Sequence, residues 1–245
     1  MSLPVAILAG GLATRLRPLT ESIPKSLIEI AGKPFAIHQV ELLQRHGITE
    51  IVFCVGHLGE KIKTALGNGS SFGVHLEYVF DGPVLLGTGG ALRKALPLLG
   101  EAFFVLYGDS YLDCDYATIE TAFWAGGKLG LMTVFRNLDQ WDRSNILFKE
   151  GQIQRYDKTH CNPDMEYIDY GLGVLQAKVF NTYAENIPVD LVQIYQDLIA
   201  RGELAAFEVT QRFYEIGSQA TLEETRRFLE QRKDTKNGLH TTIPK

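Results

Sequence analysis

The stretch 3–25, LPVAILAGGLATRLRPLTESIPK, decides how the rest of the chain is interpreted. An apolar run over 3–8 leads to the pair Gly10-Gly11, and Arg15 and Lys25 follow in a loop. This pattern predicts a buried strand that ends in a loop, where backbone N–H groups, a guanidinium and an ammonium surround a polyphosphate. We therefore interpret the stretch as a nucleotide-handling loop.

The stretch differs from two common phosphate-binding motifs. A dinucleotide-binding strand would continue as G-x-G-x-x-G into a helix, and a P-loop carries Gly-Lys-Ser/Thr directly after its glycine loop. Here Lys25-Ser26 follows Ile23-Pro24. The stretch instead resembles the signature of the sugar-phosphate nucleotidyltransferases, L-A-G-G-x-G-T-R-L-x-P-L-T with a later P-K. Ala13 stands where that family usually has its third glycine.

Composition limits the class of protein. The chain has 245 residues, 45% of them hydrophobic, and a net charge of -5, which argues against sequence-independent nucleic-acid binding. Its apolar runs are short and its start lacks the features of a signal peptide, so we expect a cytoplasmic protein that does not enter a membrane. Cys54, Cys114 and Cys161 lack the spacing of zinc ligands, and we expect reduced thiols.

The order of predicted elements indicates an α/β fold. We expect strands at 3–8, 50–55, 75–80 and 103–107, separated by a helix entered at 32–34 and ended by Gly47 and by helices at 60–66 and 88–98. This alternation predicts a parallel sheet with right-handed crossovers. Beyond 129 we expect strands at 129–135 and 204–209, a hairpin of 145–149 and 152–156, an extended segment 167–176, and helices at 190–201 and 219–231.

The resemblance implies a Rossmann-like nucleotide-diphospho-sugar transferase fold, with a mainly parallel mixed sheet and helices on both faces. We expect one domain over 1–231, with a nucleotide-binding half at 1–128 and a sugar-phosphate-binding lobe at 129–231. No linker rich in Pro, Gly or Ser separates the two parts. Residues 232–245 are polar, and we expect them to form a frayed, disordered tail.

Two acidic residues are candidate metal ligands. Asp109 follows the strand 103–107, at the edge where open α/β sheets bind ligands. Mg²⁺ usually takes one or two carboxylates together with phosphate oxygens and waters. The resemblance implies that Asp109 binds Mg²⁺ and that Glu215, in Glu215-Ile216-Gly217 where the family has D-V-G or D-I-G, is the second ligand. The alternative for Glu215 is an ion pair with Arg212.

The resemblance also implies roles in nucleotide binding. It implies that Leu8, Ala9, Gly10 and Gly11 line the base and sugar of the nucleotide, that Arg15 contacts the leaving pyrophosphate, and that Lys25 contacts the α-phosphate. The family reads the nucleobase with a segment that corresponds here to Leu86–Ala91 and includes Gly87, Thr88 and Gly89, while Asp81-Gly82 resembles an E-G of some relatives. Free N–H groups at the start of this helix would favour a carbonyl-rich or anionic ligand. The alternative is that these glycines only allow close packing.

The C-terminal part would hold the second substrate. Asp157-Lys158 corresponds to the family's E-K, whose lysine holds the phosphate of a sugar 1-phosphate. Asp169-Tyr170-Gly171 stands in place of the family's N-x-G, so Tyr170 and Gly171 are expected in the sugar-phosphate site although the asparagine is missing. Tyr107 and Trp141 either line this pocket or belong to the core.

The reaction implied by the resemblance is the transfer of a nucleotidyl group. A sugar 1-phosphate oxygen would attack the α-phosphorus of an NTP, releasing pyrophosphate and forming an NDP-sugar. Histidine, serine and cysteine do not form a pattern for covalent catalysis, which suits direct displacement. The pattern is similar to D-glycero-D-manno-heptose 1-phosphate and mannose 1-phosphate guanylyltransferases, so we expect GTP. Uridylyl- or cytidylyl transfer to N-acetylmuramate or glucose 1-phosphate and a non-catalytic nucleotide-sensing subunit are the alternatives. The sequence allows a homodimer.

Overall fold

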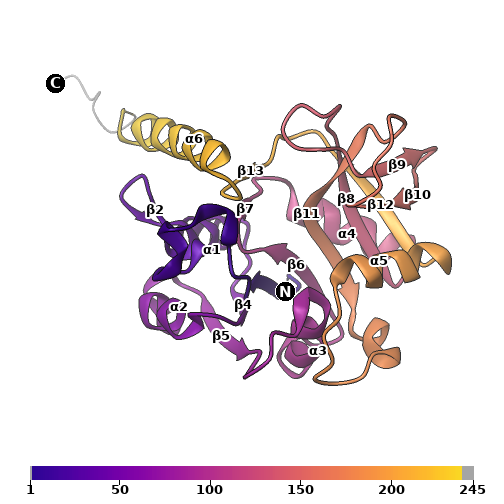
Figure 1. Ribbon diagram of the computed structural model, residues 1–245, viewed down its shortest axis with the longest axis horizontal. Coiled ribbons are helices and arrows are strands. Elements are labelled where there is room, and N and C mark those ends of the chain that lie inside the picture. Colours follow the sequence, from indigo (N-terminus) through magenta and orange to yellow (C-terminus); the bar gives the residue numbers. More distant parts are fainter. Residues whose placement is uncertain (1, 239–245) are drawn as a thin grey trace.

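The computed structural model describes residues 2–238 and confirms an α/β fold built on one mixed sheet (Figure 1). The sheet strands are β1 Val5–Ala9, β4 Glu50–Val55, β5 His75–Phe80, β6 Ala102–Tyr107, β8 Gly130–Arg136, β9 Ile146–Lys149, β10 Gln152–Tyr156, β11 Tyr167–Gln176 and β12 Leu204–Val209. The helices are α1 Phe35–Arg45, α2 Gly59–Leu66, α3 Gly87–Leu99, α4 Tyr116–Gly126, α5 Leu191–Ala200 and α6 Gln219–Gly238. Four short strands, β2 Glu29–Ile30, β3 Lys33–Pro34, β7 Ser110–Tyr111 and β13 Tyr214–Glu215, form two small ladders outside it.

The strand order places the predicted site loops at one edge. The main path is β10-β9-β11-β6-β1-β4-β5, and β8 pairs with both β11 and β12. Strands β6, β1, β4 and β5 are parallel to one another, with Val5 in register with Ile51 and Phe104. Their carboxyl ends therefore share one edge of the sheet, and the loops that follow them meet there. Strand β11 runs antiparallel to β6 and extends the same sheet into the C-terminal part.

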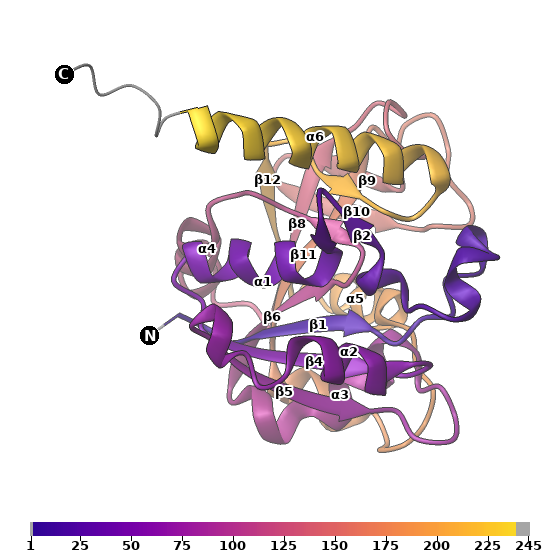
Figure 2. The same cartoon turned by 90° about the vertical axis from the view of Figure 1, so that its left-hand side faces the viewer.

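Helices cover both faces of the sheet, as expected. Successive residues of a strand point to opposite faces. Val5 and Ile7 of β1 belong to the core formed with α1, α2 and α4, whereas Ala6 belongs to the core formed with α3 and α5. A third core lies beneath α6, which runs along the top of the molecule above α1 (Figure 2).

Helix α4 was not anticipated from the sequence. Asp115 caps it, because its side chain accepts a hydrogen bond from the backbone N–H of Thr118 at 3.0 Å. Ile119 and Phe123 face the core, but the outer side also carries apolar residues, including Trp124 at 47% exposure. The apolar periodicity that usually reveals a helix is therefore weak here.

The expectation of a frayed tail from residue 232 was wrong for its first part. Helix α6 continues to Gly238, and Arg232 forms an ion pair with Asp113. No glycine or proline occurs between Gln219 and Gly238, so the sequence offers no stop before that glycine. Residues 239–245 lie outside the described part.

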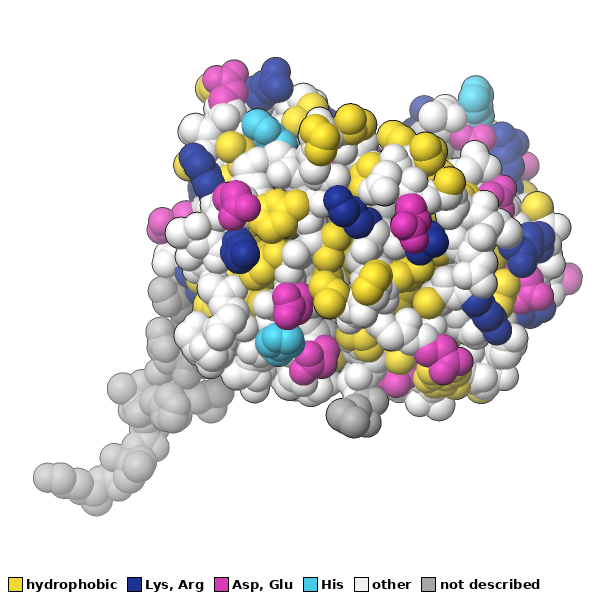
Figure 3. Space-filling model, turned by 90° about the horizontal axis from the view of Figure 1, so that it is seen from below, with side chains coloured by type: hydrophobic (Ala, Val, Ile, Leu, Met, Phe, Trp, Pro, Cys, Tyr) yellow, Lys and Arg dark blue, Asp and Glu magenta, His cyan; other side chains and the backbone are white. Residues whose placement is uncertain are grey.

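The predicted hairpin is present in the structure. The hairpin of β9 and β10 turns at Glu150 and Gly151, whose φ values of 51° and 75° suit a tight two-residue turn. Within residues 2–238, no helix is long and apolar enough to cross a membrane. On the face shown in Figure 3, lysine and arginine side chains are interspersed with aspartate and glutamate.

Candidate active site

Two neighbouring cavities share Tyr107 and Asp109 in their walls. The first, which we call the β1 cavity, has a volume of about 250 Å³. The residues that line it include Leu8, Ala9, Gly10, Gly11, Ala13, Lys25, Asp81, Gly87 and Thr88. The second, the β11 cavity, has a volume of about 300 Å³. Its lining includes Arg15, Asp142, Arg143, Lys158, Asp169, Tyr170, Gly171, Phe213 and Glu215.

The loop after β1 passes close to the loop after β4. A Cβ at Gly10 would lie 3.2 Å from the backbone nitrogen of Gly56 and 3.5 Å from Asp81 Oδ2. A side chain at Gly10 would therefore crowd the wall of the β1 cavity. A Cβ at Gly11 would meet nothing within 4 Å. Contacts within the protein therefore do not require glycine at this position.

Ala13 adopts a backbone conformation that favours glycine. Its φ of 48° and ψ of 42° lie in the left-handed region, at the signature position where the family usually has glycine. Its carbonyl accepts hydrogen bonds from the backbone N–H of Leu16 at 3.1 Å and from Thr20 Oγ1 at 2.8 Å. These two bonds hold the loop in the strained conformation despite the methyl group.

Asp81 provides a buried carboxylate in the β1 cavity. The residue is only 8% exposed, and its Oδ2 accepts a hydrogen bond from the backbone N–H of Leu86 at 3.2 Å. Burial raises the pKa of Asp81, although that hydrogen bond and Lys94 oppose the shift. Burial likewise raises the pKa of the neighbouring Cys54 thiol to about 12, so this thiol stays protonated at neutral pH.

The start of α3 corrects one prediction. The backbone N–H groups of Gly89 and Gly90 both donate to the carbonyl of Val189, at 2.9 and 3.1 Å, and are therefore not free for a ligand. A Cβ at Gly89 would lie 2.6 Å from Val189 Cγ1. Close packing against the segment before α5 explains these glycines, while Gly87 and Thr88 still line the cavity.

Lys25 and Asp109 form an ion pair between the cavities. Lys25 Nζ lies 2.6 Å from Asp109 Oδ2, and the two side chains are 17% and 27% exposed. Both residues line the β1 cavity, and Asp109 also lines the β11 cavity. The strand-end position predicted for Asp109 is confirmed. Its carboxylate lies within reach of a ligand in either cavity.

Glu215 is brought to Asp109 by a ladder that the sequence did not reveal. Strand β13 pairs with β7, with Glu215 opposite Ser110, and Ile216 N–H donates to the Asp109 carbonyl at 2.9 Å. Burial and then the Asp109 carboxylate raise the pKa of Glu215. The alternative pairing with Arg212 is wrong, since Arg212 forms its ion pair with Glu224.

The two carboxylates suit a magnesium ion that also binds phosphate. Among residues 2–238, no group of three or more His, Cys, Asp or Glu side chains is placed to hold a metal. A pair of carboxylates completed by phosphate oxygens and water is the usual arrangement for Mg²⁺. Burial, and after it the neighbouring Asp109 carboxylate, raises the pKa of Glu215, while Lys25 opposes the shift; a bound cation would favour the ionised form of both carboxylates.

Three cationic side chains line the β11 cavity: Arg15, Arg143 and Lys158. Lys158 Nζ lies 3.4 Å from Asp169 Oδ2 and 5.0 Å from the centroid of the Tyr107 ring. Arg15 is exposed and belongs to this cavity, not to the β1 cavity. Arg143 was missed from the sequence, because it lies in the loop between β8 and β9 and belongs to no recognised motif.

The segment predicted to contact the sugar is fixed by internal hydrogen bonds. Asp169 accepts hydrogen bonds from Tyr156 Oη at 2.8 Å and from Gly171 N–H at 3.0 Å. Tyr170 is only 2% exposed, and its ring packs against Phe135 and Phe213. Asp169 is therefore the polar side chain that this segment contributes to the β11 cavity, whereas the Tyr170 side chain belongs mainly to the core.

Comparison with known proteins establishes the family. The profile of the nucleotidyl transferase family matches residues 5–143. The chain therefore belongs to the nucleotidyl transferase family.

Individual relatives share the sequence or the fold. An N-acetylmuramate alpha-1-phosphate uridylyltransferase of Neisseria meningitidis is 43% identical over 118 residues, which cover 47% of this chain and 51% of that protein. The low-salt glycan biosynthesis nucleotidyltransferase Agl11 of Haloferax volcanii is 39% identical over 215 residues, covering 86% of this chain and 57% of that protein. The chain thus spans little more than half the length of these relatives. A Bacillus anthracis structure assigned as a glucose-1-phosphate thymidylyltransferase, in complex with sucrose, has a TM-score of 0.83 at 21% identity, covering 100% of this chain and 98% of that chain, and shows the same fold.

Proposed function

We propose that the protein is a nucleotidyltransferase that converts an NTP and a sugar 1-phosphate into an NDP-sugar and pyrophosphate. The observation that carries this proposal is the position of Asp109, paired with Lys25 where the two cavities meet. One cavity is bordered by a glycine loop and the other by three cations. Two substrates bound side by side would bring an attacking phosphate oxygen to the α-phosphorus.

The β1 cavity would hold the nucleotide and the β11 cavity the sugar 1-phosphate. Lys25 would contact the α-phosphate and stabilise the negative charge that builds there during displacement. Lys158 and Arg143 would bind the phosphate of the acceptor. Arg15 lines the acceptor cavity, so a contact with departing pyrophosphate would require movement of its exposed side chain.

Mg²⁺ would be held by Asp109 and Glu215. Bound there, the ion would neutralise charge on the triphosphate and favour departure of pyrophosphate. Asp109 is hydrogen-bonded to Lys25, so this carboxylate can position the ammonium and the ion together. Glu215 belongs to a short ladder, which fixes its backbone relative to Asp109.

We further propose that the preferred nucleotide is GTP, because Asp81 presents a buried carboxylate to the base. Guanine has adjacent N1–H and N2–H donors that a carboxylate can accept, whereas the single N3–H of uracil lies between two carbonyl oxygens. Asp81 is 8% exposed and lines the β1 cavity, so it is positioned to discriminate between these edges. A base that leaves the buried Asp81 carboxylate without a hydrogen-bond donor would bind more weakly.

The test is a substrate matrix. Each of GTP, UTP, CTP, ATP and dTTP is incubated with mannose, manno-heptose, N-acetylmuramate or glucose 1-phosphate in the presence of Mg²⁺, and pyrophosphate is measured. We expect release that depends on the acceptor and is fastest with GTP and mannose or heptose 1-phosphate. Faster turnover of UTP would contradict the assignment of the base and favour the activity named for the Neisseria relative.

The non-catalytic alternative gives a different outcome. A nucleotide sensor would show a rise in melting temperature on addition of an NTP but no pyrophosphate with any pair. The Lys25–Asp109 pair and the cations of the β11 cavity favour catalysis over sensing, since a sensor has no need of an acceptor site.

A further inference from the structure

Residues 212–215 present two different faces. Phe213 and Glu215 line the β11 cavity. Arg212 and Tyr214 stack on each other on the opposite side of this extended segment, with Arg212 Cζ 4.7 Å from the centroid of the Tyr214 ring. Alternation along an extended chain explains the division. The segment thus carries a candidate metal ligand on one side and a cation–aromatic cluster on the other.

The guanidinium of Arg212 contacts two aromatic rings. Its Cζ lies 3.3 Å from the centroid of the Trp141 ring and 4.7 Å from the centroid of the Tyr214 ring. Its ion pair with Glu224 ties it to α6, and its buried Nε has no hydrogen-bond partner within the described part of the chain. Stacking on the two rings is therefore a principal interaction of this partly desolvated cation.

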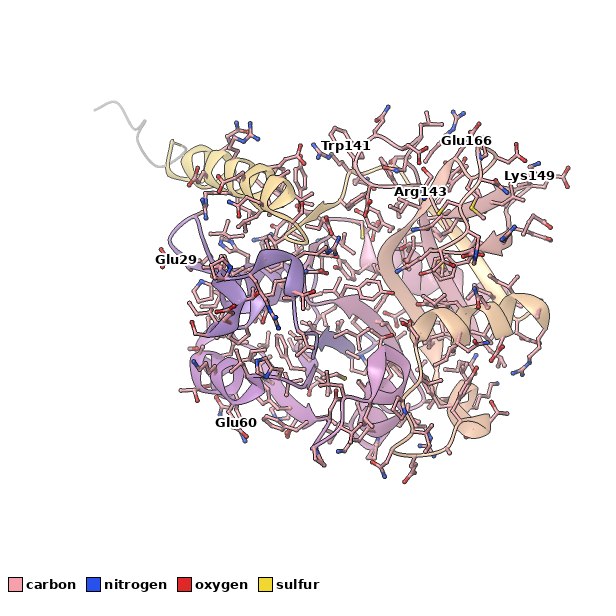
Figure 4. All side chains as sticks on the ribbon, viewed as in Figure 1. Glu29, Glu60, Trp141, Arg143, Lys149 and Glu166 are labelled. Atoms are coloured by element: carbon pink, nitrogen blue, oxygen red, sulfur yellow. The ribbon has the colours of Figure 1, made fainter. Side chains whose placement is uncertain are left out.

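Trp141 belongs to the loop that brings Arg143 to the β11 cavity. Figure 4 shows Trp141 between α6 and the labelled Arg143. Asp142, Arg143 and Asn145 all line that cavity. Arg143 also donates to the Cys161 carbonyl at 3.4 Å, a long contact at the limit of hydrogen bonding.

The loop 137–144 is rigid within itself. Asn137 Nδ2 donates to the Asp142 carbonyl at 2.6 Å, and Asp139 Oδ1 accepts from Ser144 N–H at 2.7 Å. Ser144 Oγ accepts from Asp139 N–H at 3.0 Å in return. A loop bonded in this way moves as a unit, so the contact of Trp141 with Arg212 helps to fix where its outer end lies.

The opposite end of the cluster is fixed by α6. Tyr214 stacks on Phe228, with ring centroids 3.7 Å apart and an angle of 12° between the rings. Thr225 Oγ1 donates to the Glu215 carbonyl at 2.6 Å. The strand that carries Glu215 is thus held by the helix, and Arg212 joins this fixed strand to the loop that carries Arg143.

We propose that Arg212 is a positioning residue for the acceptor substrate: by stacking on both Trp141 and Tyr214, it fixes the loop 137–144 and its Arg143 in register with Glu215. This proposal rests on the proposed function, which assigns the β11 cavity to the sugar 1-phosphate. Arg212 does not line that cavity, so its effect reaches the substrate through the loop.

The kinetic test uses Arg212→Ala, Arg212→Lys, Trp141→Ala and Trp141→Phe. We expect Arg212→Ala to raise the KM for the sugar 1-phosphate by roughly five- to tenfold and to change the KM for the NTP by less than about twofold. Trp141→Ala should raise this KM by the same factor as Arg212→Ala, and Trp141→Phe should keep most of the wild-type affinity. Arg212→Lys should recover only part of the affinity for the sugar 1-phosphate, because an ammonium lacks the planar face of a guanidinium. The double variant with Arg212→Ala and Trp141→Ala should have a KM for the sugar 1-phosphate no higher than that of either single variant.

The matched control is Arg201→Ala, which removes an exposed arginine that directly follows α5 and lines neither cavity. A second readout is tryptophan emission in a Trp124→Phe background, where Trp141 is the remaining tryptophan. Arg212→Ala should shift this emission to longer wavelength as the ring becomes more exposed, while Arg201→Ala should leave emission and both KM values unchanged.

The outcomes separate the two proposals. If the wild type turns over but Arg212→Ala keeps its KM for the sugar 1-phosphate, or loses NTP affinity by the same factor, the positioning role is wrong and the proposed function stands. Unchanged emission in Arg212→Ala would also overturn the positioning role, since the stack would not hold Trp141. A folded wild type that releases no pyrophosphate with any substrate pair would overturn the proposed function, and the positioning role with it.

Discussion

Lys25 Nζ lies 2.6 Å from Asp109 Oδ2, at the boundary between a cavity bordered by a glycine loop and a cavity lined by three cations. Lys25 comes from the loop after β1 and Asp109 from the end of β6, two strands that are neighbours in the parallel part of the sheet. Their pairing places a cation and a candidate metal ligand at the point where two substrates would react.

Asp109→Asn should reduce pyrophosphate release by at least about a hundredfold, because the amide cannot supply the charge that binds Mg²⁺. The amide keeps the size of the side chain, so the rise in melting temperature caused by an NTP without metal should persist. Steady-state release and thermal unfolding measure the two effects. Wild-type turnover in Asp109→Asn would contradict the assignment of the metal ligand.

Glu215→Asp should retain measurable activity, whereas Glu215→Gln should lose most of it. In the absence of metal, Glu215→Gln should raise the melting temperature, because it removes a partly buried negative charge next to Asp109. Added Mg²⁺ should stabilise the wild type more than Glu215→Gln. Equal stabilisation of both proteins by Mg²⁺ would show that Glu215 does not bind the ion.

Ala13→Gly should stabilise the protein by about 0.5 kcal/mol. The left-handed conformation costs an alanine about 1 kcal/mol, and the greater freedom of glycine in the unfolded chain offsets part of the gain. Urea unfolding measures the change. The control is Ala117→Gly on the exposed side of α4, which should destabilise by about 1 kcal/mol. A comparable loss of stability in Ala13→Gly would mean that the methyl group of Ala13 makes contacts that outweigh the backbone strain.

The preference for GTP should depend on the ionisation of Asp81. Burial raises the pKa of this carboxyl, so protonation begins at a higher pH than for an ordinary aspartate. As the pH falls through this raised pKa, the KM for GTP should increase, and above it the KM should be constant. Asp81→Asn should remove this dependence and lower the ratio of GTP to UTP turnover by about tenfold.

Glu77→Gln is the control for Asp81, because Glu77 is an exposed carboxylate on β5. It should leave both the pH dependence and the ratio of GTP to UTP turnover unchanged. If Asp81→Asn behaved like Glu77→Gln, the base would be recognised by other groups.

The sequence predicted the features that depend on local pattern. The apolar run before Gly10, the hairpin around Glu150-Gly151 and the strand-end position of Asp109 each follow from neighbouring residues, and all are present in the structure. The resemblance to known nucleotidyltransferases added the link from these residues to a two-substrate reaction.

Features that depend on contacts between distant segments were not predictable in this way. The ladder that brings Glu215 to Asp109 has only two residues in each strand, too few to show a pattern. The carbonyl of Val189 occupies the N–H groups of Gly89 and Gly90, and no local signal at the helix start reveals this partner. Arg143 reaches the β11 cavity only because of how its loop folds.

We infer that the two cavities bind the two substrates of one transfer reaction. The most direct measurement follows a nucleotide labelled at the α-phosphate in the presence of a sugar 1-phosphate and Mg²⁺. We predict that the label appears in a nucleotide sugar, in an amount equal to the pyrophosphate released, and that neither product forms without the acceptor. Pyrophosphate released at the same rate without the sugar 1-phosphate, or label that never enters a sugar nucleotide, would contradict the claim.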